Sequence, residues 1–366
     1  MKRLLSIRWS VAVLLLSVPV CALAQLVPSP YTWSTRYDAM GRIVGTIAPA
    51  NIIAGASKFG ASRTTYDARG NVTRTESGVL SSWQSEAVDP SSWGTSYTTF
   101  ISVENKFDTN NRKVSQSVVD SSGLVISLTQ FSYDYLARIE CTATRMNPSV
   151  YNALPTSACV LGVEGNFGPD RITKNIYDAA GQLVQVRKAL LTSFESAEGT
   201  YTFTPNGKTA QVIDGEGNRA ELRYDAYDRS MRWVFPSAVK PTAYNDSTLA
   251  NAVSTAGTLN EVDYEAYTYD AAGNRLTQRR RDGRTLTFAY DALNRPVSKT
   301  VPAGCAPIQV GGCTPASATR SVFFGYDLQG HQLSVKFDSA TGADGVTNAF
   351  DGFGQLTSST ISMAGF

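Results

Sequence analysis

Tyr37-Asp38-Ala39-Met40-Gly41-Arg42-Ile43 is the stretch of sequence that decides the fold, because the same order of residue types returns along the chain. The shared motif is Tyr or Phe, then Asp, two variable residues, Gly, a polar residue and an aliphatic residue close behind. The other copies with glycine begin at Tyr66-Asp67 (Gly70), Tyr177-Asp178 (Gly181), Tyr269-Asp270 (Gly273), Tyr326-Asp327 (Gly330) and Phe350-Asp351 (Gly354).

Four further copies lack the glycine. Asn111 takes its place after Phe107-Asp108, Asn294 after Tyr290-Asp291, Ala137 after Tyr133-Asp134 and Asp228 after Tyr224-Asp225. Asn tolerates the left-handed backbone conformation better than other residues that carry a side chain. We therefore expect the Asn copies to keep the turn and the Ala137 copy to be strained or rebuilt.

Each position of the motif suits a turn between two strands. We expect the aromatic residue to end a strand and pack its ring inward, and Asp to accept backbone N–H groups across the turn. Gly or Asn would supply a positive φ, and the aliphatic residue would begin the next strand. With 17 Tyr, 15 Phe and 29 Gly, the composition also favours strands and turns. Ten such turns predict an all-β fold of repeated hairpins in a long, curved or spiralling antiparallel sheet.

The segment between two copies fixes the expected register. A two-residue turn at Asp282-Gly283 would place Leu276 opposite Ala289. A three-residue loop that includes Arg281 gathers the apolar residues on one face, and register follows the buried face. The sequence therefore predicts the three-residue loop. Its expected pairs are Arg280–Arg284, Gln278–Leu286, Leu276–Phe288 and Asn274–Tyr290.

The spacing of the copies is uneven, so long insertions must leave the sheet as loops. We expect these at Ser81–Ser96, Thr142–Gly168 and Val239–Gly257. No linker interrupts the repeats. The expected organisation is a signal peptide at 1–24 and one repeat domain at 25–366.

The first residues predict export. Lys2, Arg3 and Arg8 precede an apolar run that is too short to span a bilayer comfortably. Ala22-Leu23-Ala24 then offers small residues for cleavage before Gln25, and an uncleaved anchor is the alternative. The mature protein would be secreted, periplasmic or at the cell surface. It would carry 33 − 3 = 30 basic and 31 acidic residues, which disfavours bulk attraction to nucleic acid.

Four cysteines remain after that cleavage, and an even number in an exported chain suggests disulfides. Three connectivities are possible. Neighbour pairing, Cys141 with Cys159 and Cys305 with Cys313, is preferred because each pair closes a short irregular loop. The spacing does not match that of a zinc site.

The motif resembles the YD (tyrosine–aspartate) repeat of the RHS (rearrangement hot spot) family, which includes the shells of teneurins and the Tc-toxin cocoon. The resemblance covers nearly all of the mature chain. It implies a β-sheet that spirals into a hollow shell, often around a C-terminal toxin, with Tyr, Asp and Gly in structural roles. The chain would form part of such a shell, incomplete at its C-terminus, because the family's core region and toxin domain are not recognisable after the last copy.

Residues that could carry catalysis are explained by the turns. His331 is the only histidine, and it follows a turn glycine where Arg, Asn or Gln stands in other copies. Most Asp residues lie in turns, which leaves no evident pair for glycoside hydrolysis. The basic cluster Arg279-Arg280-Arg281 suits a solvated hairpin tip, and Gly215 and Gly217 suit a turn. We therefore expect no enzyme, no cofactor and no metal site.

Three functions compete. The leading one is an exported structural wall with a missing or enclosed toxin domain as its partner. The second is a module that binds cell-surface glycans or proteins through its insertions and through exposed Trp83 and Trp93. A hydrolase is the third. A partial spiral would also leave open strand edges, through which the chain is expected to self-associate.

Overall fold

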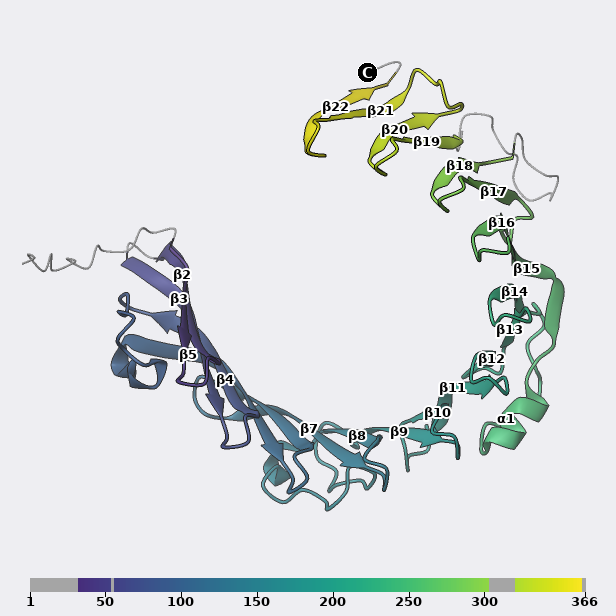
Figure 1. Cartoon of the computed structure of the whole chain (residues 1–366). Coiled ribbons are helices and arrows are strands. Elements are labelled where there is room, and N and C mark those ends of the chain that lie inside the picture. The colour runs from purple at the N-terminus through teal and green to yellow at the C-terminus, as the bar shows by residue number, and fades with distance from the viewer. Residues whose placement is uncertain (1–31, 54–55, 303–319, 364–366) are drawn as a thin grey trace, which may run out of the picture. The chain divides into compact units, whose positions relative to one another are not determined.

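The computed structural model describes residues 32–53, 56–302 and 320–363 (Figure 1). Within these ranges, 22 strands are assigned to one antiparallel sheet, beside one short α-helix, α1 (Leu249–Thr255). The prediction of an all-β, open antiparallel sheet is therefore confirmed. The expected signal peptide, Cys305 and Cys313 lie outside the described residues.

The chain divides into two compact units between Leu128 and Thr129. The division falls within β7 (Val125–Tyr133). The strands of the first unit are β1 (Ser34–Tyr37), β2 (Ile43–Ile53), β3 (Ala56–Tyr66), β4 (Val72–Leu80), β5 (Tyr97–Phe107) and β6 (Lys113–Asp120).

The second unit holds the remaining strands. They are β8 (Ile139–Arg145), β9 (Arg171–Tyr177), β10 (Leu183–Lys188), β11 (Ser196–Phe203), β12 (Thr209–Asp214), β13 (Arg219–Tyr224), β14 (Ser230–Pro236), β15 (Leu259–Tyr269), β16 (Arg275–Arg279), β17 (Thr285–Tyr290), β18 (Pro296–Thr300), β19 (Val322–Tyr326), β20 (Gln332–Phe337), β21 (Gly345–Phe350) and β22 (Leu356–Ser362).

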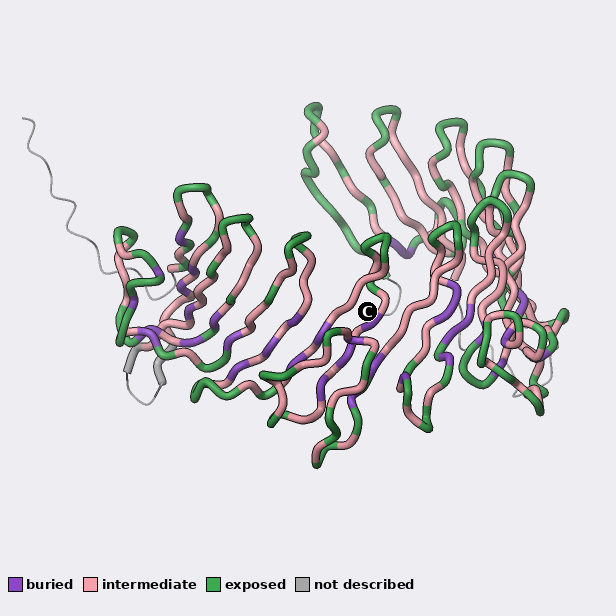
Figure 2. The backbone as a smooth tube through the Cα atoms, turned by 90° about the horizontal axis from the view of Figure 1, so that it is seen from below, coloured by how far each residue is buried: buried purple, intermediate pink, exposed green. Residues whose placement is uncertain are grey.

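The strands pair in chain order. Consecutive strands pair antiparallel from β1 through β6 and from β8 through β22. This meander follows from the turns, because a short turn can only join strands that are neighbours in the sheet. The turns form exposed tips at the strand ends, whereas the buried residues lie nearer the middle (Figure 2).

The predicted register between two copies is confirmed. Gln278 pairs with Leu286, and the N–H of Arg280 donates to the carbonyl of Arg284 at 2.8 Å. Gly283 adopts a φ of 82°, as the three-residue loop requires. Leu286 is buried, which agrees with a pairing register that places the apolar residues of both strands on one face.

The insertions leave the sheet, with one boundary corrected. The insertion expected from Thr142 begins only after Arg145, because β8 continues to that residue. Alternate side chains at the end of β8, among them Ala143 and Arg145, are buried, which makes this stretch a strand rather than a loop. The insertion after β14 contains α1, which begins at Thr248, whose hydroxyl accepts the N–H of Asn251.

A candidate functional surface of turns and one sheet face

The turns share one backbone geometry. At the first, the N–H of Gly41 donates to the carbonyl of Asp38, and the N–H of Asp38 to the carbonyl of Arg42, both at 2.9 Å. Oδ1 of Asp38 accepts the N–H groups of Met40 and Arg42, also at 2.9 Å. The same pair of bonds to Oδ1 recurs at Asp67, Asp108, Asp134, Asp225, Asp291 and Asp351.

Copies without glycine keep this geometry. Asn111, Asp228 and Asn294 have φ between 60° and 65°. Ala137 has a φ of 61°, and its N–H still donates to the carbonyl of Asp134 at 3.0 Å. The Ala137 copy is therefore strained rather than rebuilt.

A further turn has the same backbone geometry with Thr in place of Asp. Phe203 ends β11, and Thr204 takes the position of the aspartate. The N–H of Thr204 donates to the carbonyl of Lys208 at 2.8 Å, and the hydroxyl of Thr204 accepts the N–H of Lys208 at 3.1 Å. Pro205-Asn206-Gly207 has the residue order of a type I turn and predicts a turn at this place, which the bond from the N–H of Gly207 to the carbonyl of Thr204 confirms.

At five turns a tyrosine hydroxyl group donates to the strand that follows the neighbouring turn. The hydroxyl of Tyr66 donates to the carbonyl of Ile43, the first residue of β2, at 2.9 Å. Tyr269 does the same to Ser230, the first residue of β14, at 2.9 Å. Tyr177, Tyr224 and Tyr290 reach Ile139, Thr209 and Arg275 in the same way. The rings therefore lie along the row of turns rather than packing inward as expected, and the ring of Tyr37 in the first turn is 61% exposed.

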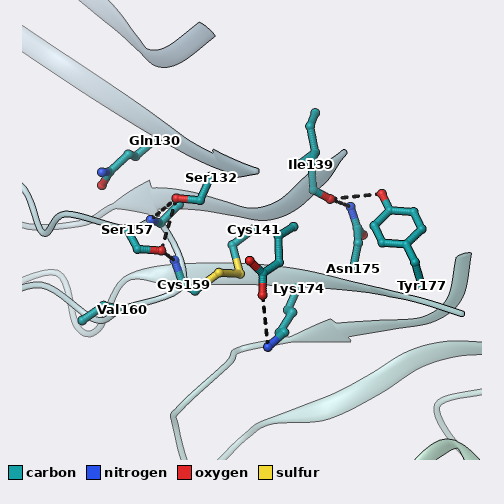
Figure 3. The surroundings of a disulfide bond; sticks show 12 residues. Gln130, Ser132, Ile139, Cys141, Ser157, Cys159, Val160, Lys174, Asn175 and Tyr177 are labelled. Carbon is teal, nitrogen blue, oxygen red and sulfur yellow. Dashed lines mark hydrogen bonds and ion pairs between the residues drawn. A yellow bond between two sulfur atoms is a disulfide. The ribbon is translucent and has the colours of Figure 1, made fainter. Parts of the chain in front are cut away.

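Asparagine makes this bond where phenylalanine has no hydroxyl group. Two residues before Phe107, the side chain of Asn105 donates to the carbonyl of Val72 at 3.0 Å. Asn348 stands two residues before Phe350 and donates to the carbonyl of Gln332 at 2.9 Å. At β9 an asparagine and a tyrosine converge on the carbonyl of Ile139, as Figure 3 shows. Every acceptor in this set is the first residue of a strand that follows a turn.

The residue after the left-handed position, which we name the clamp residue, joins neighbouring turns. Arg229 donates Nε to the Asp225 carboxylate at 2.7 Å and lies over the ring of Tyr269, 4.7 Å from its centroid. It also donates to the carbonyl of Asp270 at 2.9 Å. Arg295 makes the same three contacts with Asp291, Tyr326 and Asp327. The sequence displayed Arg at this position without revealing that it spans two turns.

The turn carboxylates are held ionised. The backbone N–H of Arg42 and then its side chain keep the pKa of Asp38 below its ordinary value. At Asp291 the backbone N–H of Arg295 is again the largest cause of the lowered pKa, opposed by desolvation. Carboxylates used in this way accept hydrogen bonds and are poor proton donors, which fits a structural role.

Insertions cover part of a sheet face in each unit, taken separately. In the first unit, Trp93 from the segment between β4 and β5 packs with Ile47, Ala61, Leu80 and Tyr97. Trp93 is only 2% exposed, and Trp83 is partly buried against the same cluster. The expected exposure of Trp93 is therefore wrong, because its ring helps to build a local core, and Trp83 is only partly accessible beside it.

The insertion after β8 is bound to the sheet by a disulfide and a buried ion pair. Cys141 of β8 is joined to Cys159, with Cα atoms 5.2 Å apart (Figure 3). Arg145 donates to the carboxylate of Asp170 at 2.6 Å, with 3% and 5% of the two side chains exposed. Arg145 also donates to the carbonyls of Val160 and Ser157 within the insertion.

The insertion after β14 covers the neighbouring strands of the same face. The carbonyl of Asp246 accepts from Gln185 and Arg187 of β10. Gln185 pairs with Thr200, and Thr200 with Ile213, so the three share a face. All three are 1% exposed or less. Ile176 pairs with Gln185 and lies on the same side of β9 as Ile172, which packs beneath the other insertion.

The opposite face of the second unit is free of described insertions. Following directly opposed pairs from Leu222 across to β22 gives a continuous, mostly apolar row, which we name the bare face. No described segment folds back over it. Its members are Leu222, Trp233, Glu265, Tyr267, Gln278, Leu286, Phe288, Lys299, Val322, Phe324, Val335, Phe337, Val346 and Ile361.

The same strands carry more polar residues on the insertion side, although Val234 and Phe323 also lie there. Arg223 pairs with Arg232, Thr287 with Thr300, and Ser334 with Thr347. Most apolar side chains of the bare face remain partly accessible, and Trp233 is 40% exposed. Extended exposed apolar surfaces of this kind occur in soluble proteins mainly at interaction sites.

The basic hairpin tip is exposed, as expected, and some of its charges are paired. Arg281 pairs with Asp263 at 2.6 Å, and Arg284 pairs with Asp282 at 2.6 Å. Arg279 donates to the carbonyl of Tyr264. The two ion pairs offset the charges of Arg281 and Arg284.

Metal sites and membrane-spanning helices were sought among the residues that the structure describes. Among those residues, no group of three or more His, Cys, Asp or Glu could hold a metal ion. No described helix has the length and apolar character needed to cross a bilayer. Gly217 has a φ of 82° within the turn that begins at Asp214, as its turn assignment requires.

Comparison with known structures gives weak global likenesses. The crystal structure of TcdB2-TccC3-Cdc42 is 14% identical, covers 90% of this chain and 23% of its own, and has a TM-score of 0.29. The crystal structure of TcdB2-TccC3 is 14% identical, covers 90% and 24%, and has a TM-score of 0.21. A porin-like protein from Bacteroides uniformis is 8% identical, covers 69% and 95%, and scores 0.20. TM-scores this low carry no argument about function.

The chain spans about a quarter of the TcdB2-TccC3 chains it matches. No curated protein matches its sequence. One family model does match, that of the RHS Repeat, over residues 269–304. This stretch includes the turns at Tyr269 and Tyr290 and the confirmed three-residue loop between them. The chain is therefore a protein that contains an RHS repeat.

Proposed function

We propose that the chain is an exported, non-enzymatic wall segment of the RHS type, and that its bare face contacts an enclosed polypeptide. In the family that the motif resembles, that polypeptide is a toxin domain. The two described insertions of the second unit lie on one face, while apolar side chains line the other. This asymmetry supports a wall with an outer and an inner side.

The bare face suits an unfolded or partly folded chain. Its aromatic and branched side chains, such as Phe288 and Val335, offer area without directional polar groups. Such a surface gains by removing apolar side chains of any sequence from water, at about 25 cal/mol per Å². It therefore favours polypeptide in general over one small ligand.

Binding of an unfolded protein tests this proposal. Fluorescently labelled, reduced and carboxymethylated α-lactalbumin would be titrated with the purified full chain, and anisotropy would be followed. We expect saturable binding, and about 10-fold weaker binding after the joint change Phe288→Ser and Phe324→Ser, since each removes a large apolar side chain. The matched control is Thr287→Ser with Phe323→Ser, which alters the insertion side of the same strands.

Absence of binding, or equal losses in both variants, would contradict the assignment of the bare face. Sedimentation velocity on the same samples measures self-association, which remains a prediction of exposed strand edges. Circular dichroism shows whether each variant keeps its strand content.

Export is the second part of the proposal. We expect N-terminal sequencing of the mature protein to begin at Gln25, and the thiols of Cys141 and Cys159 to be blocked to alkylation until reduction. Their sulfur atoms are bonded in the structure, and such bonds persist in oxidising compartments. A cytosolic protein with free thiols at both positions would contradict this part alone.

The bonding of the turn aspartates supports a non-enzymatic role. Their carboxylates accept backbone N–H groups and clamp side chains, as at Asp225. They are therefore occupied in folding the chain. Hydrolysis of a glycan or peptide substrate by the purified chain, abolished by a single Asp→Asn change, would refute a purely structural role.

A further inference from the structure

A polar cavity of about 480 Å³ lies in the first unit, within the range of volumes that hold small organic ligands. Its walls come from the first turn, from strands β2, β3 and β4, and from the insertion that follows β4. The insertion contributes the 3₁₀ turn Pro90–Ser92 and the aspartate before it. Segments that are distant in the sequence therefore line a single space.

The insertion side of the cavity is fixed in place. Gly45 of β2 has no side chain, and a Cβ there would lie 2.5 Å from Cγ of Pro90 and 3.1 Å from the ring of Trp93. The insertion therefore packs directly on the strand, with Pro90 and Trp93 buried. Oδ1 of Asp89 accepts the N–H of Ser91 at 2.8 Å, which orients that carboxylate beside the cavity. A wall held in this way loses little freedom when a ligand binds.

The sheet side of the cavity is held by a well-ordered ion pair. Arg63 donates Nε and Nη2 to the two carboxylate oxygens of Glu76, both at 2.9 Å. The side chain of Glu76 is 9% exposed, and its Oε1 also accepts the hydroxyl of Thr99 at 3.2 Å. The guanidinium of Arg63 lies over the ring of Tyr97, 4.6 Å from the centroid. Its Nη1 makes no hydrogen bond to any residue that the structure describes, so this nitrogen remains a donor for a ligand.

Arg74 and Thr65 add polar groups that the protein itself engages little. The side chain of Arg74 is 44% exposed, and its ion pairs with Glu76 and Glu104 are 3.3 Å and 3.6 Å long. Both distances exceed that of a charge-assisted hydrogen bond. Thr65 pairs with Arg74 across β3 and β4, so the two side chains project from the same face. A guanidinium and a hydroxyl group therefore stand side by side, open to a ligand.

The charges around the cavity balance. Its lining holds three arginines and three carboxylates, which leaves no net charge. They are Arg42, Arg63 and Arg74, and Asp38, Glu76 and Asp89. Hydrogen bonds from the side chain and backbone of Ser91 lower the pKa of Asp89, so this carboxylate stays ionised near neutral pH. An anionic ligand would therefore meet no net positive charge, and a cationic ligand would meet three guanidinium groups.

We propose that the polar cavity binds a short neutral carbohydrate. A sugar hydroxyl both donates and accepts hydrogen bonds, so adjacent hydroxyl groups match adjacent guanidinium donors and carboxylate acceptors. Apolar or aromatic side chains in the lining are limited to Val44, Pro90 and Tyr66, which is too little for the side chains of a peptide. The site belongs to the first unit and shares no residue with the bare face. It adds ligand recognition to the proposed wall function without depending on it.

Saturation-transfer NMR on the full chain tests this inference. The probes are the neutral disaccharides maltose, cellobiose, lactose and N,N′-diacetylchitobiose, with digalacturonic acid and the glucosamine dimer as charged comparisons. We expect at least one neutral disaccharide to bind saturably, with a Kd of about 1 mM or below. Both charged disaccharides should bind about 10-fold more weakly, because the cavity offers them no net opposite charge.

Paired substitutions locate the binding. Thr65→Val with Arg74→Gln removes a hydroxyl and a guanidinium from the cavity and should weaken binding about 10-fold through lost hydrogen bonds. The matched control, Thr75→Val with Lys106→Gln, makes the same kinds of change outside the cavity. Thr75 stands on the other face of β4, and Lys106 stands on β5. The control should bind as the wild type does, and circular dichroism checks the strand content of both variants.

Thr65→Val alone keeps every charge and should weaken binding about 3-fold. This variant is the test if the paired variant does not fold. Binding of none of the neutral disaccharides, tighter binding of a charged one, or equal affinities of the wild type and Thr65→Val would overturn the inference. Equal losses in the paired variant and its control would do the same. These results are independent of the α-lactalbumin titration, so failure here leaves the proposed wall function untouched.

Discussion

At Ala137 an alanine occupies a backbone conformation that glycine fills in six other copies of the motif. The turn persists because its other bonds are intact: Asp134 still accepts two backbone N–H groups and the side chain of Arg138. Local hydrogen bonding therefore outweighs an unfavourable φ at a single residue. The left-handed conformation costs a residue with a Cβ roughly 1–2 kcal/mol.

Ala137→Gly should accordingly stabilise the protein by about 1 kcal/mol, since the relief of strain exceeds the added freedom of glycine in the unfolded chain. Urea unfolding followed by circular dichroism measures the change. Gly41→Ala is the reverse control. Its φ is 75° and nothing lies near the added Cβ, so it isolates the backbone cost and should destabilise by about 1 kcal/mol.

The exchange of Tyr for Asn as hydrogen-bond donor gives a second prediction. Asn105→Ala leaves the carbonyl of Val72 without its donor and should cost about 1 kcal/mol. Adding Phe107→Tyr to that variant should recover most of the loss, because the new hydroxyl takes the place that Tyr66 has at Ile43. Equal urea midpoints for the single and double variants would show that the donors are not interchangeable.

At the scale of elements, insertions differ from turns in how they are attached. Turns repeat one local set of bonds, whereas each insertion is bound by its own buried groups, such as Arg145 with Asp170 and Arg187 with the carbonyl of Asp246. Buried arginine side chains of the strands thus donate hydrogen bonds to the insertions. Removing one such cation leaves its partners desolvated without compensation.

Arg145→Met should therefore destabilise the second unit by about 3 kcal/mol, because the buried carboxylate of Asp170 loses its cation. The double change Arg145→Met with Asp170→Asn should be less costly than the single change, since no buried charge remains. Differential scanning calorimetry gives both values. If the two variants unfold alike, the buried charge does not determine the cost.

Across the whole molecule, the turn carboxylates make stability depend on acid. A lowered pKa in the folded state contributes stability above the ordinary carboxylate pKa of about 4, and that stability is lost as the pH falls through the folded-state pKa. Asp38, Asp108 and Asp291 all show this direction, with a backbone N–H as the first cause. Because many turns respond together, the loss should be steep.

We therefore expect the urea midpoint to be nearly constant from pH 7 to 5 and to fall sharply below about pH 4. Thr204→Asp provides the matched test, since Thr204 already stands at the aspartate position of a turn. That variant should be more stable than the wild type at pH 7 and should lose the gain below pH 4. A gain that persists in acid would mean that the carboxylate charge has no part in it.

Much of the fold could be predicted because the motif acts locally. Asp, the left-handed residue and the strand-ending aromatic residue lie within five positions, so one turn forms from its own residues wherever it stands. The register at Arg280–Arg284 followed from the same short-range logic together with the alternation of apolar residues. The turn at Thr204 was indicated by Pro205-Asn206-Gly207, but it does not match the motif because a hydroxyl replaces the carboxylate.

The amino-acid sequence by itself determined the hairpins, their order and their register, because turn geometry and side-chain alternation are properties of neighbouring residues. Only the tertiary structure decided which face the insertions cover, that Trp93 is buried, and that clamp residues such as Arg229 reach the next turn. Those contacts join segments far apart in the chain. Such contacts depend on how strands stack, which no short pattern of residues encodes.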